Sequence, residues 1–356
     1  MELKELKVVE LASVLAGPSV GMFFAELGAE VIKVENKTTG GDVTRRWRLP
    51  SEAGDAPTSA YYHSVNYGKR VLLKDLRDPE EREEVLALID QADVLISNFK
   101  TASAHKLELA YEQICQRNPR LIYAQLHAFG EGIDRPAFDI VLQAETGFMY
   151  MCGEPGRDPV RMPVALIDLL AAHQLKEGIL LALWQRERSG KGAYVSSSLL
   201  EAAIASLANQ ATNWLMAGYL PQRMGSQHPN IAPYGDVFYT SDRLPVVLAA
   251  GTDRQFDALC QCLQMEALVQ DPRFATNAQR VIHRQQLRES LRPAFEQCTR
   301  EELMEAFGKA GVPAGSIRNM KEVFEQEQAR QMILEEDLPD GSKSRSVKTV
   351  AFQIKY

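Results

Sequence analysis

The chain has 356 residues and a mass of 39.7 kDa, and its 40 lysines and arginines against 47 aspartates and glutamates give a net charge of −7. Hydrophobic residues make up 45% and charged residues 24%, a balance that excludes a largely disordered chain. The acidic balance argues against a general nucleic-acid-binding protein, but it allows a local basic pocket for an anionic ligand.

The cysteines and the N-terminal residues argue against a disulfide-rich or secreted protein. Five cysteines in a chain of this length form no disulfide framework, and Cys260 and Cys262 lack a second pair at zinc-binding spacing. The first five residues carry acids where a signal peptide has a cationic start. Because no uninterrupted apolar run reaches about 18 residues, we expect no membrane span. The sequence therefore predicts a cytoplasmic protein without a metal, a membrane or a nucleic-acid partner.

Short apolar strands alternate with helices in the first part of the chain. Pro18 lies near the expected start of the first helix and Gly28 where that helix should stop, and Asp78-Pro79 should open another that runs to about residue 92. The expected strands are residues 6–11, 30–35, 70–74, 93–99 and 121–126. This alternation predicts an α/β fold with a mostly parallel sheet, helices on both faces, and ligands at the carboxyl ends of the strands.

The second half is predicted to be mainly helical. Residues 164–184 and 198–217 have helical patterns, and the proline- and glycine-rich segment 221–235 reads as a loop. A smaller piece follows, with a strand at 244–250 and helices from about residue 253.

Several residues could carry chemistry, each beside a purely structural alternative. Asp168 is the only acid in the apolar stretch 162–170, where it could cap a helix or act as a nucleophile held by the helix dipole. His127 ends the fifth strand as a possible base or a structural histidine. The turn at 17–21 could bind an anion at a helix start, or could be only a tight turn.

Read together, ordered segments of the chain resemble class III CoA-transferases, a family that shares its fold with alpha-methylacyl-CoA racemase. The matching segments include Val9-Glu10-Leu11 with Ala16-Gly17-Pro18, then residues 27–35, 41–45, 66–70, 92–99, 118–123, 198–201 and 225–234. The resemblance implies a Rossmann-like large domain at 1–200 completed by 318–356, a linker helix at 201–221, a smaller α+β domain at 222–300 and a return linker at 301–317. It also implies an interlocked homodimer.

The resemblance implies that Asp168 attacks an acyl-CoA thioester, giving first an acyl-aspartyl anhydride and then an aspartyl-CoA thioester that a carboxylic acid acceptor resolves. Asp139 matches an acidic active-site position of the transferases. Coenzyme A would be a substrate rather than a resident cofactor. Its expected site is formed by Val14, Ala16, Lys69, Asn98, Phe99, Lys106 and Leu107, with Lys37 and Arg45 as looser candidates for phosphate contacts.

Departures from the family pattern keep two alternatives open. Racemases carry a histidine just before the acidic position, where this chain has Phe138, so a racemase would lack one of its two bases. The expected lid at 249–255 has one glycine instead of a run, and Leu15 replaces a polar residue of formyl-CoA transferase. A catalytically silent acyl-CoA-binding protein is the second alternative.

Overall fold

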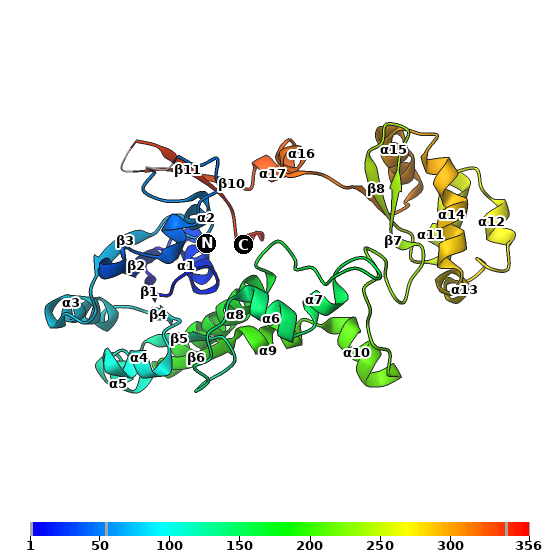
Figure 1. The fold of residues 1–356 in the computed structure, drawn as a ribbon. Coiled ribbons are helices and arrows are strands. Elements are labelled where there is room, and N and C mark those ends of the chain that lie inside the picture. The colour runs from blue at the N-terminus through cyan, green and yellow to red at the C-terminus, as the bar shows by residue number, and fades with distance from the viewer. Residues whose placement is uncertain (1–2, 54–55, 339–340, 356) are drawn as a thin grey trace. The chain divides into compact units, whose positions relative to one another are not determined.

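The structure is a computed structural model, and it describes residues 3–53, 56–338 and 341–355. The chain divides into two compact units (Figure 1). The larger unit comprises residues 1–147, 161–209 and 330–356, and the smaller comprises 148–160 and 210–329.

A six-stranded parallel sheet is the centre of the larger unit. Its strands are β1 (Lys7–Leu11), β2 (Glu30–Asn36), β3 (Arg70–Lys74), β4 (Val94–Ser97), β5 (Ile122–His127) and β6 (Ala193–Ser198), in the spatial order β3-β2-β1-β4-β5-β6. Every neighbouring pair is parallel. The strand order reverses between β1 and β4, which is the place where Rossmann-like sheets bind ligands. The five strands expected from the sequence are confirmed within two residues at each end.

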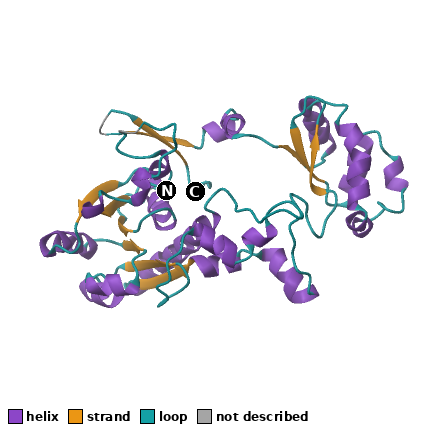
Figure 2. Ribbon diagram, in the orientation of Figure 1, coloured by secondary structure: helices purple, strands orange, loops and turns teal. Residues whose placement is uncertain are grey.

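Helices cover both faces of this sheet (Figure 2). On one face, α3 (Pro79–Asp90) and α5 (Tyr111–Arg117) pack Val85, Ile89 and Ile114 against alternate strand residues. On the other face, α1 (Ala16–Glu26) and α8 (Leu166–Ser189) pack against each other and against the strands. Asp78 accepts hydrogen bonds from the first amides of α3, as its sequence position before a proline predicts.

Close packing explains the glycines of the turn after β1. A Cβ at position 21 would lie 1.9 Å from a carboxylate oxygen of the buried Glu10, and one at position 17 would lie 2.3 Å from the Ala12 side chain. Glycine therefore lets α1 approach the strand closely. The structural reading of this turn accounts for both glycines without a bound anion.

Shorter elements complete the larger unit. They are the 3₁₀ turns η1 (Lys37–Thr39) and η2 (Val43–Arg46), the helices α2 (Ala60–His63), α4 (Thr101–Lys106), α6 (Asp139–Glu145) and α9 (Leu199–Ala205), and a hairpin of β10 (Ile333–Asp337) and β11 (Lys343–Val347). The helix expected over 198–217 is interrupted. Its second part is α10 (Ala208–Ala217), and Ala208 has a φ of +46° at the break.

The smaller unit has its own core around an antiparallel sheet of β7 (Tyr234–Tyr239), β8 (Pro245–Ala249) and β9 (Ala314–Ser316). Its helices are α7 (Phe148–Met151), all but the first two residues of α10, α11 (Asp253–Cys262), α12 (Ala267–Gln270), α13 (Asn277–Ile282), α14 (Arg284–Phe295), α15 (Arg300–Ala310), α16 (Met320–Phe324) and α17 (Glu327–Arg330). Leu303 and Phe307 of α15 and the following Val312 are buried in this core. Residues 301–317 are thus a packed part of the small unit, where we had expected a return linker.

Candidate active site

Asp168 lies in the first turn of the long helix α8, at the third helical residue. The residue is 8% exposed. Among the described residues, its carboxylate forms no side-chain hydrogen bond and no ion pair. The carboxylate is therefore largely shielded from solvent but has no side-chain partner. A nucleophile needs such a free carboxylate, whereas a structural helix cap would accept hydrogen bonds from the first amides of the helix.

Asp139, the first residue of α6, supplies the cap that α8 lacks in its own sequence. The residue preceding α8 is Ala165, which has no capping group. Asp139 Oδ1 instead accepts hydrogen bonds from the backbone amides of Ile167 at 2.7 Å and Asp168 at 3.4 Å. One carboxylate thus fixes the start of the helix that carries the other.

Gln143 holds Asp139 in place from one turn further along α6. Its Nε2 donates to Asp139 Oδ2 at 2.6 Å, and its Oε1 accepts from the Met162 amide at 2.9 Å. The Gln143 side chain is fully buried. The spacing of four residues between Asp139 and Gln143 places both on one helix face, which is the sequence signal for this pair. The sequence analysis did not assign Gln143 a role.

The Asp168 carboxyl group is a weaker acid than an ordinary aspartate. Burial, and next the nearby charge of Asp139, raise the pKa of Asp168 to about 7. A carboxylate with such a pKa is more basic than an ordinary one, and it is still ionised in a large fraction of molecules near neutral pH. Both properties favour nucleophilic attack.

A cavity of about 340 Å³ opens beside Asp168 and Asp139. Its other lining residues are Val14, Trp47, Tyr61, Phe138, Ile140, Arg161 and Ala165. Trp47 packs edge-on against Tyr61 and Phe138, with ring centroids 5.1 and 6.1 Å apart. Burial, together with Asp168 and Asp139, raises the pKa of Tyr61 to about 12, so its phenol remains a hydrogen-bond donor.

Val14 enters this cavity in a strained backbone conformation, with a φ of +74°. A β-branched residue rarely adopts the left-handed region. Its amide donates to Asp42 Oδ2 at 3.1 Å, and Asp42 is held in turn by the Lys33 ammonium at 3.2 Å. The buried Asp42 and Lys33 therefore hold the loop after β1 in place at the cavity wall.

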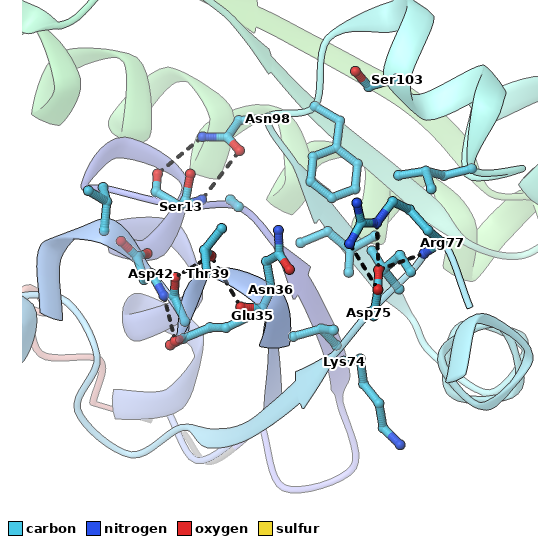
Figure 3. Close-up of a pocket in the computed structure, with 18 of the residues that line it drawn as sticks. Ser13, Glu35, Asn36, Thr39, Asp42, Lys74, Asp75, Arg77, Asn98 and Ser103 are labelled. Atoms are coloured by element: carbon cyan, nitrogen blue, oxygen red, sulfur yellow. Dashed lines mark hydrogen bonds and ion pairs between the residues drawn. The ribbon is translucent and has the colours of Figure 1, made fainter. Parts of the chain in front are cut away.

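A second cavity, of about 670 Å³, lies at the carboxyl ends of β1 to β4 (Figure 3). Its polar wall includes Ser13 and Asn98, whose backbone and side chain exchange hydrogen bonds of 3.3 and 3.1 Å. Arg77 is paired with Asp75 at 3.0 Å on the opposite side of the view. The position at the reversal of strand order and the basic residues are typical of an anionic nucleotide site.

The structure brings some of the expected CoA residues to these cavities. Asn98, Phe99 and Leu107 line the larger cavity, and Val14 lines the cavity beside Asp168. Four basic residues also line the larger cavity: Arg46, Lys74, Arg77 and Lys100. Lys100 donates to the Asp134 carbonyl at 2.9 Å and Arg46 to the Thr39 carbonyl at 2.9 Å. Neither cation forms an ion pair within the described part of the chain.

The other expected CoA residues lie elsewhere. The Lys69 ammonium is fully buried and bound to Glu10 at 2.8 Å, the Pro18 carbonyl at 2.7 Å and Asn66 at 3.1 Å. This set of partners is inconsistent with a direct phosphate contact. Arg45 binds Glu35 at 2.6 Å, and Lys37 binds Glu81 at 2.5 Å. Ala16 is buried at the start of α1, and Lys106 is exposed in the last turn of α4.

The positions of Phe138 and His127 argue against the racemase alternative. Phe138 lines the cavity beside Asp168, whereas His127 lines two other cavities and lies 3.5 Å from the Tyr194 hydroxyl. Of the described residues that line the Asp168 cavity, none is a histidine.

The described residues contain neither a cluster of metal ligands nor a membrane-spanning helix. No group of three or more histidine, cysteine, aspartate or glutamate residues is arranged to hold a metal ion there. No helix in the same residues has the length and apolarity required to span a membrane.

The chain is similar in sequence to known CoA-transferases. Residues 3–356 match the family described as "CoA-transferase family III". A succinate–glutarate CoA-transferase of Agrobacterium fabrum is 39% identical, over 98% of this chain and 88% of that protein. A human succinyl-CoA:glutarate CoA-transferase is 33% identical, over 96% of this chain and 78% of that protein.

The fold is also similar to that of a protein of known crystal structure. A CAIB/BAIF family protein from Brucella suis has 39% sequence identity and a TM-score of 0.83, covering 98% of this chain and 91% of that one. The α/β architecture with a parallel sheet is therefore common to this chain and an experimentally determined relative.

Proposed function

The chain belongs to CoA-transferase family III and is a CoA-transferase, and we propose that it moves CoA between two carboxylic acids through covalent intermediates on Asp168. The buried, unpaired carboxylate of Asp168 beside a substrate-sized cavity carries this proposal. The names of the relatives favour succinyl-CoA as donor and a dicarboxylic acid as acceptor.

In the proposed reaction, Asp168 attacks the carbonyl carbon of the acyl-CoA, and the carbon–sulfur bond breaks to release CoA thiolate. The product on the enzyme is a mixed anhydride. The thiolate then attacks the aspartyl carbonyl, which forms an aspartyl-CoA thioester and frees the first acid. The acceptor carboxylate attacks this thioester, and the same two steps run in reverse. Each intermediate divides one difficult exchange into easier steps.

The surroundings of Asp168 suit this chemistry. Trp47, Tyr61 and Phe138 give the cavity an apolar wall against which an acyl chain can pack, and Asp168 itself is 8% exposed, which reduces the access of water to the anhydride. The protonated Tyr61 can donate a hydrogen bond to an oxygen that develops negative charge. Asp139 acts as a positioning residue, because its carboxylate is bound to the start of α8.

We assign the nucleotide end of CoA to the larger cavity at the carboxyl ends of the strands. Arg46 and Lys100 line it without a carboxylate partner in the described part of the chain, so they can bind phosphate oxygens. Phe99 offers a ring for the adenine. Asn98 holds the loop after β1 through Ser13, so we assign it a positioning role.

Mass spectrometry after chemical trapping tests the covalent route. The protein is incubated with succinyl-CoA, quenched with hydroxylamine and digested. We expect a hydroxamate on the peptide that contains Asp168, because hydroxylamine attacks both the anhydride and the aspartyl thioester. Asp168→Asn should give no adduct, should lose at least about 10³-fold in transfer rate and should still bind CoA.

Two results would contradict the proposal. One is wild-type transfer of CoA with the adduct on a different peptide or on none. The other is CoA binding without any exchange between acyl-CoA and free acids, which would favour the silent acyl-CoA-binding protein.

A further inference from the structure

Arg161 is the only lysine or arginine among the described residues that line the cavity beside Asp168. It lies in the segment just before α8, on a wall that also includes Tyr61 and Phe138. The same cavity contains two carboxylates, Asp168 and Asp139. A further anion entering this space needs a cation to offset the repulsion, and this side chain alone supplies one.

The Arg161 guanidinium has unused hydrogen-bonding capacity. One nitrogen, Nη1, donates to the Pro163 carbonyl at 3.0 Å and to the Met162 carbonyl at 3.4 Å. No carboxylate pairs with it among the described residues. Because a guanidinium has five N–H groups, donors on the other two nitrogens remain for a ligand. The two carbonyl contacts hold the planar group at the cavity wall.

Arg161 and Asp168 line the same cavity, and no ion pair joins them in the described part of the chain. The charge of Arg161 partly offsets the rise in the pKa of Tyr61 that burial and the nearby carboxylates cause, whereas the pKa of Asp168 is raised by burial and next by Asp139. The guanidinium is therefore not the counter-ion of the nucleophile. The cavity that both residues line has a volume of about 340 Å³, enough for a short carbon chain.

We propose that Arg161 binds the second carboxylate of a dicarboxylic substrate while the reacting carboxyl group lies at Asp168. This inference rests on the proposed function and adds to it the residue that selects the substrate class. A planar guanidinium and a carboxylate form paired, charge-assisted hydrogen bonds, which fix both the position and the direction of the carbon chain.

Selection for dicarboxylic acids follows from the chemistry of the walls. A carboxylate placed against Trp47 and Phe138 would lose part of its hydration, and a cation beside it offsets that cost. Conversely, an acid that ends in a methyl or amide group brings no negative charge to pair with the Arg161 guanidinium. Arg161 is exposed, so discrimination against such an analogue comes from the lost charge pairing.

The same contact serves both halves of the exchange. The acyl group of the donor and the incoming acceptor occupy the same cavity in turn, because both react at Asp168. Each would place its distal carboxylate on Arg161. We therefore expect donor and acceptor to be of the same chemical class, two short dicarboxylic acids.

The test compares two donors that differ only at the far end of the acyl group: succinyl-CoA and its monoamide analogue, succinamyl-CoA. For each donor, kcat/KM is measured in the full-length wild-type protein and in Arg161→Met and Arg161→Lys. We expect Arg161→Met to lose about 10–100-fold with succinyl-CoA and less than about threefold with succinamyl-CoA. Arg161→Lys should keep part of the preference, because it keeps the charge without the planar fork.

Arg188→Met is the matched control, since Arg188 is exposed near the end of α8 and its guanidinium lies 4.1 Å from the Trp184 ring centroid. It should leave the preference unchanged. The inference is overturned if Arg161→Met slows both donors equally, or if wild-type protein does not distinguish them. It is separate from the proposed function, which fails if wild-type protein forms no adduct at Asp168 with a donor that it turns over, or if it binds CoA without any exchange between acyl-CoA and free acids.

Discussion

Burial raises the pKa of Asp168 most, and the neighbouring carboxylate of Asp139 adds a contribution that can be measured. Asp139 lies against the backbone amides of Ile167 and Asp168, and its charge contributes to the raised pKa of Asp168. The nucleophile must be ionised to attack. In wild-type protein, kcat/KM should therefore rise about tenfold per pH unit up to about pH 7 and level off above it.

Asp139→Asn should move this acid limb to lower pH by up to about one unit. The amide retains an oxygen that can accept from the Ile167 amide, but it no longer opposes ionisation of Asp168. The measurement is the pH profile of kcat/KM with succinyl-CoA. Asp158→Asn, which removes an exposed acid, serves as control. An unchanged limb in Asp139→Asn would show that the two carboxylates are not coupled.

Thermal unfolding gives a second readout for the same substitution. The folded pKa of Asp168 is above its unfolded value, so the folded state binds the extra proton between about pH 4 and 7. Stability from this group is present below about pH 4 and is lost as pH rises to about 7. Asp139→Asn should reduce this loss and so should flatten the decline in melting temperature over that window.

At the residue scale, the sequence predicted the position of Asp168 in the fold better than it predicted the surroundings of Lys69. Asp168 stands out as a lone acid in an apolar stretch, and its position at a helix start follows from the pattern. Lys69 stands beside a strand like any solvated lysine, yet its ammonium is buried on Glu10. No local pattern reveals this, because Glu10 and Lys69 meet only through the packing of α1 against the sheet.

At the scale of elements, a buried charge cluster joins β1, β2 and the segment before β3. Glu10 binds Lys33 and Lys69, each at 2.8 Å, and Lys33 also binds Asp42 at 3.2 Å. These ion pairs are almost completely shielded from solvent. Two cations and two anions balance one another, so removal of one partner leaves an uncompensated charge in the core.

Lys69→Met should lower the free energy of unfolding by about 3–5 kcal/mol, and Glu10→Gln combined with Lys69→Met should recover most of this loss. The measurement is urea unfolding at pH 7. Lys37→Met, which removes an exposed lysine paired with Glu81, should have little effect. The double variant should also keep the wild-type KM for acyl-CoA. A raised KM in a stable double variant would restore Lys69 as a CoA ligand.

Strand β6 was not predicted from the sequence, and the linker expected at 301–317 conflicts with the helical pattern expected from about residue 253. Strand β6 has only Tyr194 and Val195 as typical strand residues before a run of serines, and its partner β5 lies far away in the sequence. The expected linker at 301–317 contains α15, whose buried Leu303 and Phe307 are separated by four residues. That spacing was available as a signal, whereas the pairing of β6 could be seen only in three dimensions.

At the scale of the whole molecule, exposed apolar side chains support the homodimer that the family resemblance implies. Helix α10 has no buried residue, and Trp214, Leu215 and Met216 are 53%, 74% and 85% exposed. In α8, Leu181 and Trp184 are 67% and 55% exposed. Short helices gain most of their stability from packing, so we expect another chain to cover a helix that has only partly buried residues in its own chain.

We therefore expect the protein to be a dimer in solution, with twice the 39.7 kDa mass of the chain. Light scattering coupled to size-exclusion chromatography measures this mass directly. Leu215→Glu combined with Met216→Glu should shift the population toward monomer, because each places a charge in an apolar contact. A matched pair on the exposed face of α14, Gln285→Glu with Gln286→Glu, should leave the mass unchanged. A monomeric wild-type protein at micromolar concentration with full transferase activity would show that one chain builds the site alone.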